Sequence, residues 1–294
     1  MTRALQYAAD ALSTGGLYAL FACGLSLVLS VARIANFAYG SVLMVAAYML
    51  LVTRALAWPI ALIVVIASAV VLSVLIDRVA FAPLRRADAV TLLVASFGVS
   101  ILIQNLVVLI AGARPASVNF GASFDNAVSI GSVHIAKIDI LTFVVTAAVL
   151  LSLWLFLTRS LIGIQLRAAA EDFTMSRLAG VRANRVIAVA FAISGAIAGI
   201  AATLLTMQSG SLSTDVGLQP TLIAFIAVVV GGTGSVVGAT VGGLLLGIVS
   251  VVLQATLPSH LLPYHDAILF SIVIFMLLGR PQGLFGARAA GVRI

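Results

Sequence analysis

Charge is scarce in this chain. Only 9% of its 294 residues are Asp, Glu, Lys or Arg, whereas soluble globular domains carry about 25%. With 63% hydrophobic residues and a mean hydropathy of +1.25, the chain falls outside the soluble class. A bilayer span needs about 20 mostly apolar residues, so the sequence predicts an all-α, polytopic membrane protein that forms one transmembrane domain over residues 1–294.

Cysteine and lysine each occur once. Cys23 lies in an apolar run, cannot form an internal disulfide, and is expected to pack in the core. Lys137 does not belong to a GxxxxGK motif, so the chain lacks a phosphate-binding loop and cannot hydrolyse nucleotide itself. No Ser-His-acid or metal-ligand cluster stands out, which argues against a membrane enzyme and predicts no metal and no cofactor. Uphill transport would need energy from another subunit.

Acids and histidines are missing from the interiors of the apolar segments. The polar residues there are neutral: Asn36, Ser96, Ser100, Gln104, Asn105, Ser194 and Gln219. Proton-coupled carriers normally need an acid or a histidine inside the membrane, so a proton pump or proton symporter is disfavoured. A stand-alone passive channel or secondary facilitator remains an alternative to a subunit of a larger transporter.

Nine hydrophobic segments can be delimited, which predicts about eight or nine transmembrane helices. Seven are separated by polar breaks: 11–31, 37–52, 58–76, 90–111, 140–157, 186–207 and 262–278. The uncharged stretch 216–265 is too long for one span. We expect it to hold two segments divided at Gly231–Ser235, either two full spans or a re-entrant pair within 216–258.

The basic residues predict the orientation. The loops 31–36, 77–88, 159–185 and 279–294 hold 12 of the 16 basic residues, which places them in the cytoplasm by the positive-inside rule. The N-terminus and the loop 112–137 then lie outside, and that loop is expected to be ordered and to contain a short hairpin. The same rule explains the net charge of +7 without a nucleic-acid partner.

The loop 159–185 is the most charged helix-prone stretch, with five arginines and two acids. Ala168–Ala179 is expected to form one helix, with Arg167 and Glu171 spaced i, i+4 and Gly180 as its stop. Charges of both signs favour docking to a partner protein, and an amphipathic helix on the membrane surface is the alternative.

Two glycine-containing or polar breaks could line a permeation path. Gly232 and Thr233 lie in the break at Gly231–Ser235, for which a tight turn between closely crossing helices is favoured over a pathway lining. Asn36 could be a helix cap, or could line the path together with Tyr39. Gln104 is a further candidate for the path.

At six collinear stretches the sequence resembles the permease subunits of branched-chain amino acid ABC importers, the LivH type. The stretches are GGLYALFACGLSLVLSVARIANFAYGSVLMVAAY (15–48), DRVAFAPLRR (77–86), RAAAEDFTMSRLAGV (167–181), FAISGAIAGIAATLL (191–205), AVVVGGTGSVVGATVGGLLLGIV (227–249) and RPQGLFG (280–286). The chain departs from the family pattern NFAHG at Tyr39, where histidine is usual, and the region 112–137 matches poorly.

The resemblance implies the ABC importer permease fold and a multi-pass subunit of the bacterial inner membrane. It implies four kinds of partner: a LivM-like permease, two cytoplasmic ATPases, a periplasmic binding protein and the lipid bilayer. The segment matching 167–181 would be the coupling helix that contacts the ATPase, and its candidate residues are Arg167, Glu171, Asp172, Arg177, Leu178 and Gly180. Relatives of this kind also import urea, short amides and aromatic acids.

Overall fold

The computed structural model describes residues 2–85, 87–112, 115–117, 127–130, 133–280 and 282–285. Its helices are α1 (Thr2–Ala32), α2 (Tyr39–Val52), α3 (Trp58–Ile76), α4 (Ala82–Leu84), α5 (Ala89–Ala111), α6 (Lys137–Arg159), α7 (Leu161–Glu171), α8 (Phe173–Leu178), α9 (Ala183–Ser209), α10 (Leu218–Gly231), α11 (Val236–Thr256) and α12 (His265–Gly279). Three short turns join them: η1 (Thr53–Ala55), η2 (Asp77–Phe81, a π-turn) and η3 (Leu262–Tyr264).

Each of the nine predicted hydrophobic segments forms a helix in the described residues. Seven of these helices are long and apolar enough to cross a membrane, and two shorter apolar helices, α2 and α10, accompany them. α2 and α10 have 14 residues each, about 21 Å at 1.5 Å per residue, which is less than the roughly 30 Å of a hydrocarbon core. The fold is therefore that of a polytopic helical membrane protein.

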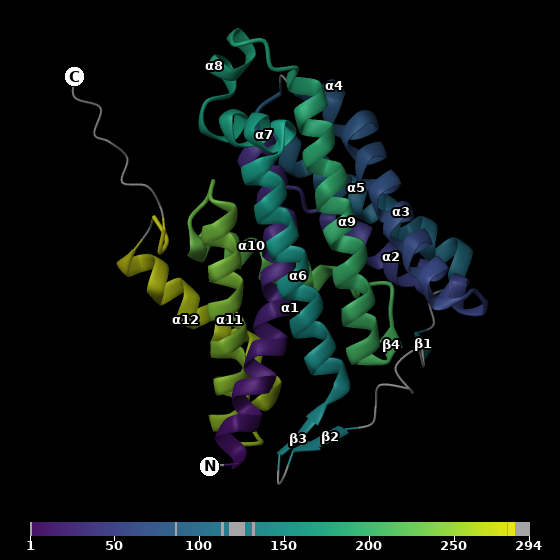
Figure 1. Ribbon diagram of the computed structural model, residues 1–294, viewed down its shortest axis with the longest axis vertical. Coiled ribbons are helices and arrows are strands. Elements are labelled where there is room, and N and C mark those ends of the chain that lie inside the picture. Colours follow the sequence, from purple (N-terminus) through teal and green to yellow (C-terminus); the bar gives the residue numbers. More distant parts are fainter. Residues whose placement is uncertain are drawn as a thin grey trace.

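α1 lies at the centre of the bundle (Figure 1), in contact with α6, α7, α9, α10 and α11. Its contact with α11 is made through glycine. A Cβ added at Gly247 would overlap the backbone of Gly15, and one at Gly243 would lie 2.7 Å from the backbone of Ala19. Small residues allow two helices to approach this closely in lipid, so the glycines of α1 and α11 define the core.

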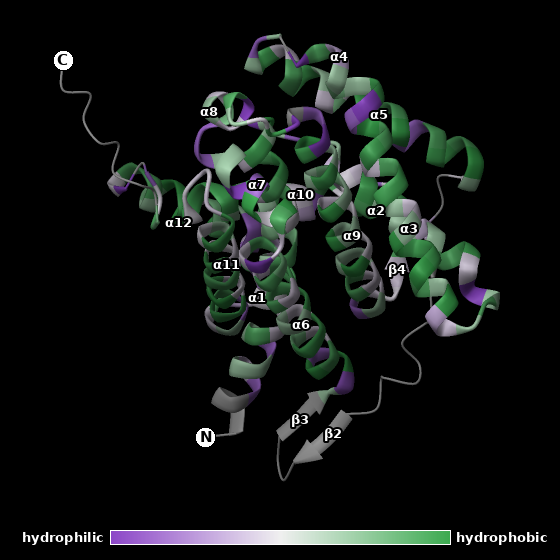
Figure 2. Ribbon diagram, turned by 45° about the horizontal axis from the view of Figure 1, so that its top comes forward, coloured by the Kyte–Doolittle hydropathy of each residue, from purple (hydrophilic) through white to green (hydrophobic). Residues whose placement is uncertain are grey.

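The outer helices carry apolar side chains on exposed faces. In the most apolar 18 residues of α5 and of α6, 11% and 17% are buried, and in Leu262–Gly279, which contains η3 and α12, 11% is buried. Figure 2 shows α6 and α12 coloured mainly as hydrophobic, with hydrophilic residues gathered toward the ends of the bundle. Such surfaces are stable only against lipid or another apolar subunit.

The strands are few and short. β2 (Ala127–Ile130) pairs antiparallel with β3 (Val133–Ala136), which confirms the predicted hairpin between α5 and α6. β1 (Ala116–Ser117) pairs antiparallel with β4 (Ser211–Leu212), the segment that follows α9. Residues 118–126 and four of the basic residues counted above, Arg86, Arg114, Arg288 and Arg293, lie outside the described residues.

The two ends of the bundle differ in the connections that they hold. α4, α7 and α8 gather at one end, and the β2–β3 hairpin and the start of α1 lie at the other (Figure 1). The loops 77–88 and 159–185 therefore share an end, as the distribution of basic residues requires. The orientation relative to the membrane stays a prediction.

Candidate functional site

The loop 159–185, which we call the polar segment, begins with a sharp reversal between α6 and α7. The Ser160 hydroxyl accepts a hydrogen bond from the amide of Gly163 at 2.9 Å and so caps α7. Gly163 faces the end of α6 so closely that a Cβ there would overlap the backbone of Phe156. Sequence reasoning did not single out Ser160 or Gly163, although a serine just before an amphipathic run is a helix-start signal.

The predicted helix Ala168–Ala179 is wrong, because the chain breaks at Asp172. The backbone of Asp172 is extended (φ −141°, ψ 101°), so α7 ends at Glu171 and α8 begins at Phe173. The Asp172 carboxylate accepts hydrogen bonds from the amides of Thr174 and Met175, both at 2.9 Å. An aspartate competes with the helical backbone in this way and favours the start of a new helix over the middle of an old one.

The predicted helix stop at Gly180 is confirmed. Gly180 has φ +87°, the left-handed region that glycine occupies without strain. Its amide donates to the carbonyl of Arg177 at 3.1 Å, and the amide of Val181 donates to that of Ser176 at 3.0 Å. These two hydrogen bonds make a Schellman motif, which turns the chain back toward α9.

The segment has a docked face and a free face. Three residues of α7 are buried against the bundle: Gly163, Leu166 and Ala169. By contrast Met175 is 63% and Leu178 is 77% exposed, and Arg167, Glu171, Asp172 and Arg177 are exposed as well. No ion pair joins Arg167 to Glu171 in the described part of the chain. Charges of both signs and two large apolar side chains are therefore available to another molecule.

Predicted coupling residues and a predicted path residue line one cavity at the end of the bundle that holds α7 and α8. The cavity has a volume of about 470 Å³ and includes Arg167 and Glu171 of α7, Thr233 of the turn between α10 and α11, and Phe285 near the end of the chain. The polar segment and the turn Gly231–Ser235, which we call the glycine turn, therefore line the same cavity. Arg177 lines a different cavity, described below.

The glycine turn is built by close contact between helices. A Cβ at Gly231 would overlap the backbone of Gly238, and Gly232 and Gly234 have φ values of +104° and +101°. The amides of Leu284 and Phe285 donate to the carbonyls of Val230 and Gly231, at 2.7 and 3.2 Å, and so satisfy the free end of α10. Leu284 and Phe285 therefore close this turn.

The two short helices meet at their N-terminal ends. Gly40 at the start of α2 touches Gly217, which precedes α10, so closely that a Cβ on either would overlap the other. The Ser41 hydroxyl lies 2.9 Å from that of Ser100, which is near the middle of α5 (Ala89–Ala111). Both short helices thus begin at mid-depth in the bundle and run to opposite ends, an arrangement found in transporters with discontinuous helices.

The remaining candidates for the path are spread around this meeting point. Asn36 is buried, and its side-chain oxygen accepts from the amide of Ala38 at 3.1 Å, just before α2. Tyr39 is 1% exposed, and its hydroxyl lies against Gly24 without a hydrogen-bond partner. Gln104 is half-buried on α5. Their assignment to the translocation path stays a prediction, as does that of Gly232 and Thr233.

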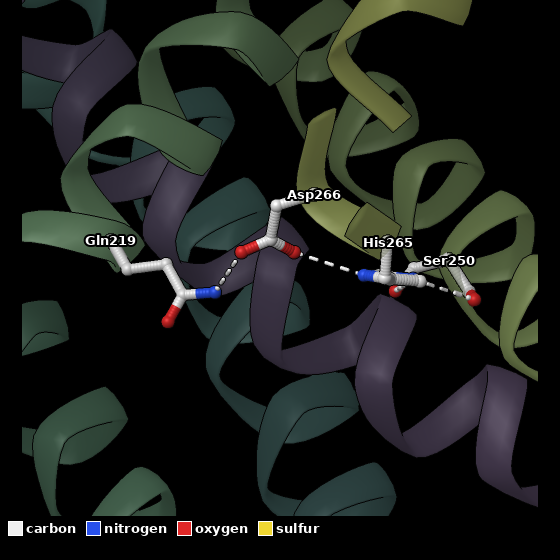
Figure 3. Close-up of polar contacts among 4 residues, drawn as sticks. All are labelled: Gln219, Ser250, His265 and Asp266. Atoms are coloured by element: carbon white, nitrogen blue, oxygen red, sulfur yellow. Dashed lines mark hydrogen bonds and ion pairs between the residues drawn. The ribbon is translucent and has the colours of Figure 1, made fainter. Parts of the chain in front are cut away.

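A polar cluster around the start of α10 was not predicted. Gln219 donates to Asp266 at 2.8 Å, Asp266 lies 2.9 Å from Nδ1 of His265, and Nε2 of His265 lies 3.2 Å from the Ser250 hydroxyl (Figure 3). Together with Tyr18, three of these residues line a cavity of about 540 Å³. The cluster ties the start of α10 to α11 and α12. In the described residues no group of His, Cys, Asp or Glu could hold a metal ion.

The apolar helices and the glycine-packed core define the class, a polytopic helical membrane protein. The family model for the permease component of the branched-chain amino acid transport system matches residues 7–278. This chain therefore belongs to the branched-chain amino acid transport permease family.

Named relatives agree with the family model. The chain is 35% identical to the high-affinity branched-chain amino acid transport system permease protein BraD of Pseudomonas aeruginosa, over 96% of this chain and 95% of BraD. It is 34% identical to LivH of Escherichia coli K12 over the same shares. The ribose import permease RbsC of Haemophilus influenzae is 25% identical over 60% of this chain and 55% of its own. No solved structure gives a significant match.

Proposed function

We propose that this chain is the transmembrane subunit of an ATP-driven importer for branched-chain amino acids or related small polar solutes. The observation that carries the proposal is the family match, which extends over residues 7–278 and so overlaps each of the nine apolar helices of the described residues. BraD and LivH, at 35% and 34% identity, are named for branched-chain amino acid transport. Family membership favours this function over a stand-alone channel or facilitator.

The energy source in this proposal is a pair of cytoplasmic ABC ATPases. The chain has one lysine and no phosphate-binding loop, so ATP hydrolysis belongs to partner subunits. The same proposal includes a second, LivM-like permease, a periplasmic binding protein and a location in the bacterial inner membrane. The exposed apolar faces of α5, α6 and α12 offer area both to lipid and to the second permease.

The ATPase is proposed to bind α7 and α8. These helices combine a buried face with exposed Met175 and Leu178, and a docking helix needs both a fixed base and a free apolar side. The coupling residues proposed are Arg167, Glu171, Asp172, Arg177, Leu178 and Gly180. In this arrangement Asp172 sets the angle between α7 and α8, and Gly180 sets the return of the chain to α9.

The translocation path is proposed to pass the meeting point of α2 and α10. Unwound backbone at mid-depth is tolerated in a membrane protein only where it is buried in protein or lines a water-filled path. Asn36 and Tyr39 lie beside that point. Gln104 lies on α5, four residues after Ser100, and Gly232 and Thr233 follow the end of α10. The polar cavity at Gln219 and Asp266 lies beside the start of α10 and would belong to the same part of the path.

Coupling is tested in proteoliposomes that contain the complete complex, by substrate-stimulated ATP hydrolysis and by uptake. Gly180→Val forces a β-branched residue into positive φ, at a strain of about 1–3 kcal/mol, and should reduce uptake at unchanged subunit stoichiometry or release the ATPases. Ala179→Val is the matched control, because Ala179 is exposed and has an ordinary φ of −74°.

Glu171→Arg replaces the exposed acid of α7 and should weaken ATPase binding, with Glu171→Gln as its milder counterpart. Wild-type uptake and hydrolysis in Gly180→Val and Glu171→Arg would show that this segment is not the coupling element. Uptake by the chain alone, without ATPases, would instead support the stand-alone facilitator.

A further inference from the structure

A strongly basic groove lies beside the coupling segment, where η2 and α4 meet the start of α9. It consists of two adjoining cavities of about 520 and 780 Å³, which share Arg85, Asn184 and Arg185. We call it the arginine groove. The arginines that line it are Arg78, Arg85, Arg177, Arg182 and Arg185.

Among the described residues a single acid lines the arginine groove, and it is already paired. Asp77, 1% exposed, accepts two hydrogen bonds from Nη2 of Arg85, at 2.8 and 3.0 Å. Arg85 also donates to the Asn184 side chain, and its Nε is buried without a partner. The Asp77–Arg85 pair fixes the floor of the groove, and it leaves the groove with an excess of positive charge.

The other four arginines have no acidic partner in the described part of the chain. Within the described residues no ion pair or side-chain hydrogen bond involves the guanidinium of Arg78, Arg177, Arg182 or Arg185. Arginines held this close together repel one another, and an anion that accepts from several of them relieves the repulsion. The ligand that the groove fits is therefore negatively charged, and phosphate oxygens suit its forked donors.

Below the arginines the wall of the groove is apolar. Ala188, Val189 and Ala192 of α9 line it together with Ala82. At 1.5 Å per residue, Ala192 lies about 15 Å along the axis from Arg182, toward the middle of a helix that is apolar enough to span a membrane. The groove is thus basic at its mouth and apolar along its depth. A ligand that fills it must be anionic at one end and apolar along the rest.

We propose that the arginine groove binds an anionic phospholipid of the cytoplasmic leaflet, with the phosphate among the arginines and an acyl chain along α9. Basic pockets between transmembrane helices on this side of a membrane are suited to such headgroups. An acidic loop of the ATPase would satisfy Arg177 and Arg182 from the water side, and it would leave the wall at Val189 and Ala192 uncovered. Free phosphate would do the same.

The test uses the purified full-length chain in nanodiscs made of phosphatidylcholine alone or of phosphatidylcholine with phosphatidylglycerol. Retained lipid is measured by native mass spectrometry and by spin-labelled phosphatidylglycerol. The variant is Arg182→Gln/Arg185→Gln, two exposed residues outside the proposed coupling set. The matched control is Arg159→Gln/Arg280→Gln, which removes two exposed arginines that do not line the groove.

We expect the wild type to retain phosphatidylglycerol in preference to phosphatidylcholine. The groove variant should lose roughly fivefold in retention for each arginine removed, and the control should lose little. Equal losses in variant and control would overturn the proposal, as would displacement of the lipid by excess inorganic phosphate. Unchanged lipid retention in the groove variant would overturn it as well.

Discussion

α1 and α5 are both apolar helices long enough to cross a membrane, yet the bundle uses them in opposite ways. The most apolar 18 residues of α1 have a mean hydropathy of 1.9, and 83% of them are buried. The most apolar 18 residues of α5 have a mean hydropathy of 2.3, and 11% of them are buried. α3, with the highest hydropathy of 2.9, is 28% buried. Hydropathy therefore identifies which segments are apolar and does not tell which of them lies at the centre.

Small residues tell the two kinds of helix apart. Lipid is as apolar as leucine, so helices in a membrane associate through close packing and not through burial of apolar area. Gly15 of α1 lies directly against Gly247 of α11, while Gly98 of α5 has no atom within 4 Å of the place where a Cβ would stand. The central helices are therefore those whose backbones are in contact through glycine, as α1 and α11 are.

The strongest way to break this comparison is Gly247→Val. The Cβ of the new side chain would overlap the backbone of Gly15. Because residues 15 and 247 both belong to helices, the overlap can be relieved only if α1 and α11 move apart. Overpacking costs about 1–3 kcal/mol where side chains can adjust, so we expect at least about 3 kcal/mol here. The measurement is the thermal unfolding midpoint of the purified chain in detergent, with size-exclusion chromatography as a check on assembly.

Gly98→Val is the control for Gly247→Val, because it is the same substitution in a span of similar length with open space around it. It should change the free energy of unfolding by less than about 0.5 kcal/mol. Similar effects of the two substitutions would contradict the distinction between a glycine-packed core and a lipid-facing helix.

A smaller effect is expected from Asp77→Asn, at the point where α3 continues into η2. Asp77 is 1% exposed and pairs with Arg85, and removing one partner of a buried ion pair leaves the other charge uncompensated. The expected loss is about 2–3 kcal/mol, below the usual range, since the Arg85 side chain is 20% exposed. The unfolding midpoint in detergent measures it.

Asp88→Asn is the control for Asp77→Asn, because Asp88 is exposed and its side chain makes no cap hydrogen bond. Arg85→Gln combined with Asp77→Asn should recover part of the loss, since neither charge is then buried alone. A full loss in the double variant would mean that Asp77 stabilises the protein by contacts other than the ion pair.

The sequence was sufficient to predict the nine apolar helices, the hairpin before α6 and the stop at Gly180, because each depends on local composition. It did not predict the break at Asp172, because the i, i+4 pattern around it is equally consistent with one helix, and only the cap hydrogen bonds decide between them. Gly163 was also missed, since its constraint is set by the backbone of α6.

Contacts between distant segments could not be predicted. Gly40 and Gly217 meet although more than 170 positions separate them, and no pattern in either segment names the other. The same is true of the Gln219–Asp266 hydrogen bond across 47 positions. A single sequence contains no signal for such pairs, so the positions of the candidate path residues relative to one another depend on the structure.

The smallest effect on stability, and the most informative one for transport, is expected from Tyr39→Phe. The Tyr39 hydroxyl is buried without a hydrogen-bond partner, so its removal should leave the free energy of unfolding unchanged within about 1 kcal/mol or raise it slightly. If Tyr39 lies on the translocation path, the same hydroxyl can bind the polar groups of a passing solute, and uptake should fall about fivefold, the equivalent of one hydrogen bond. Tyr48→Phe is the matched control: Tyr48 is also on α2, and its hydroxyl is also buried without a partner, but it is not among the proposed path residues. Uptake in proteoliposomes with the full complex measures both variants. A reduced rate in Tyr39→Phe alone supports the path past the start of α2, and equal rates in both variants would make Tyr39 a packing residue of the core.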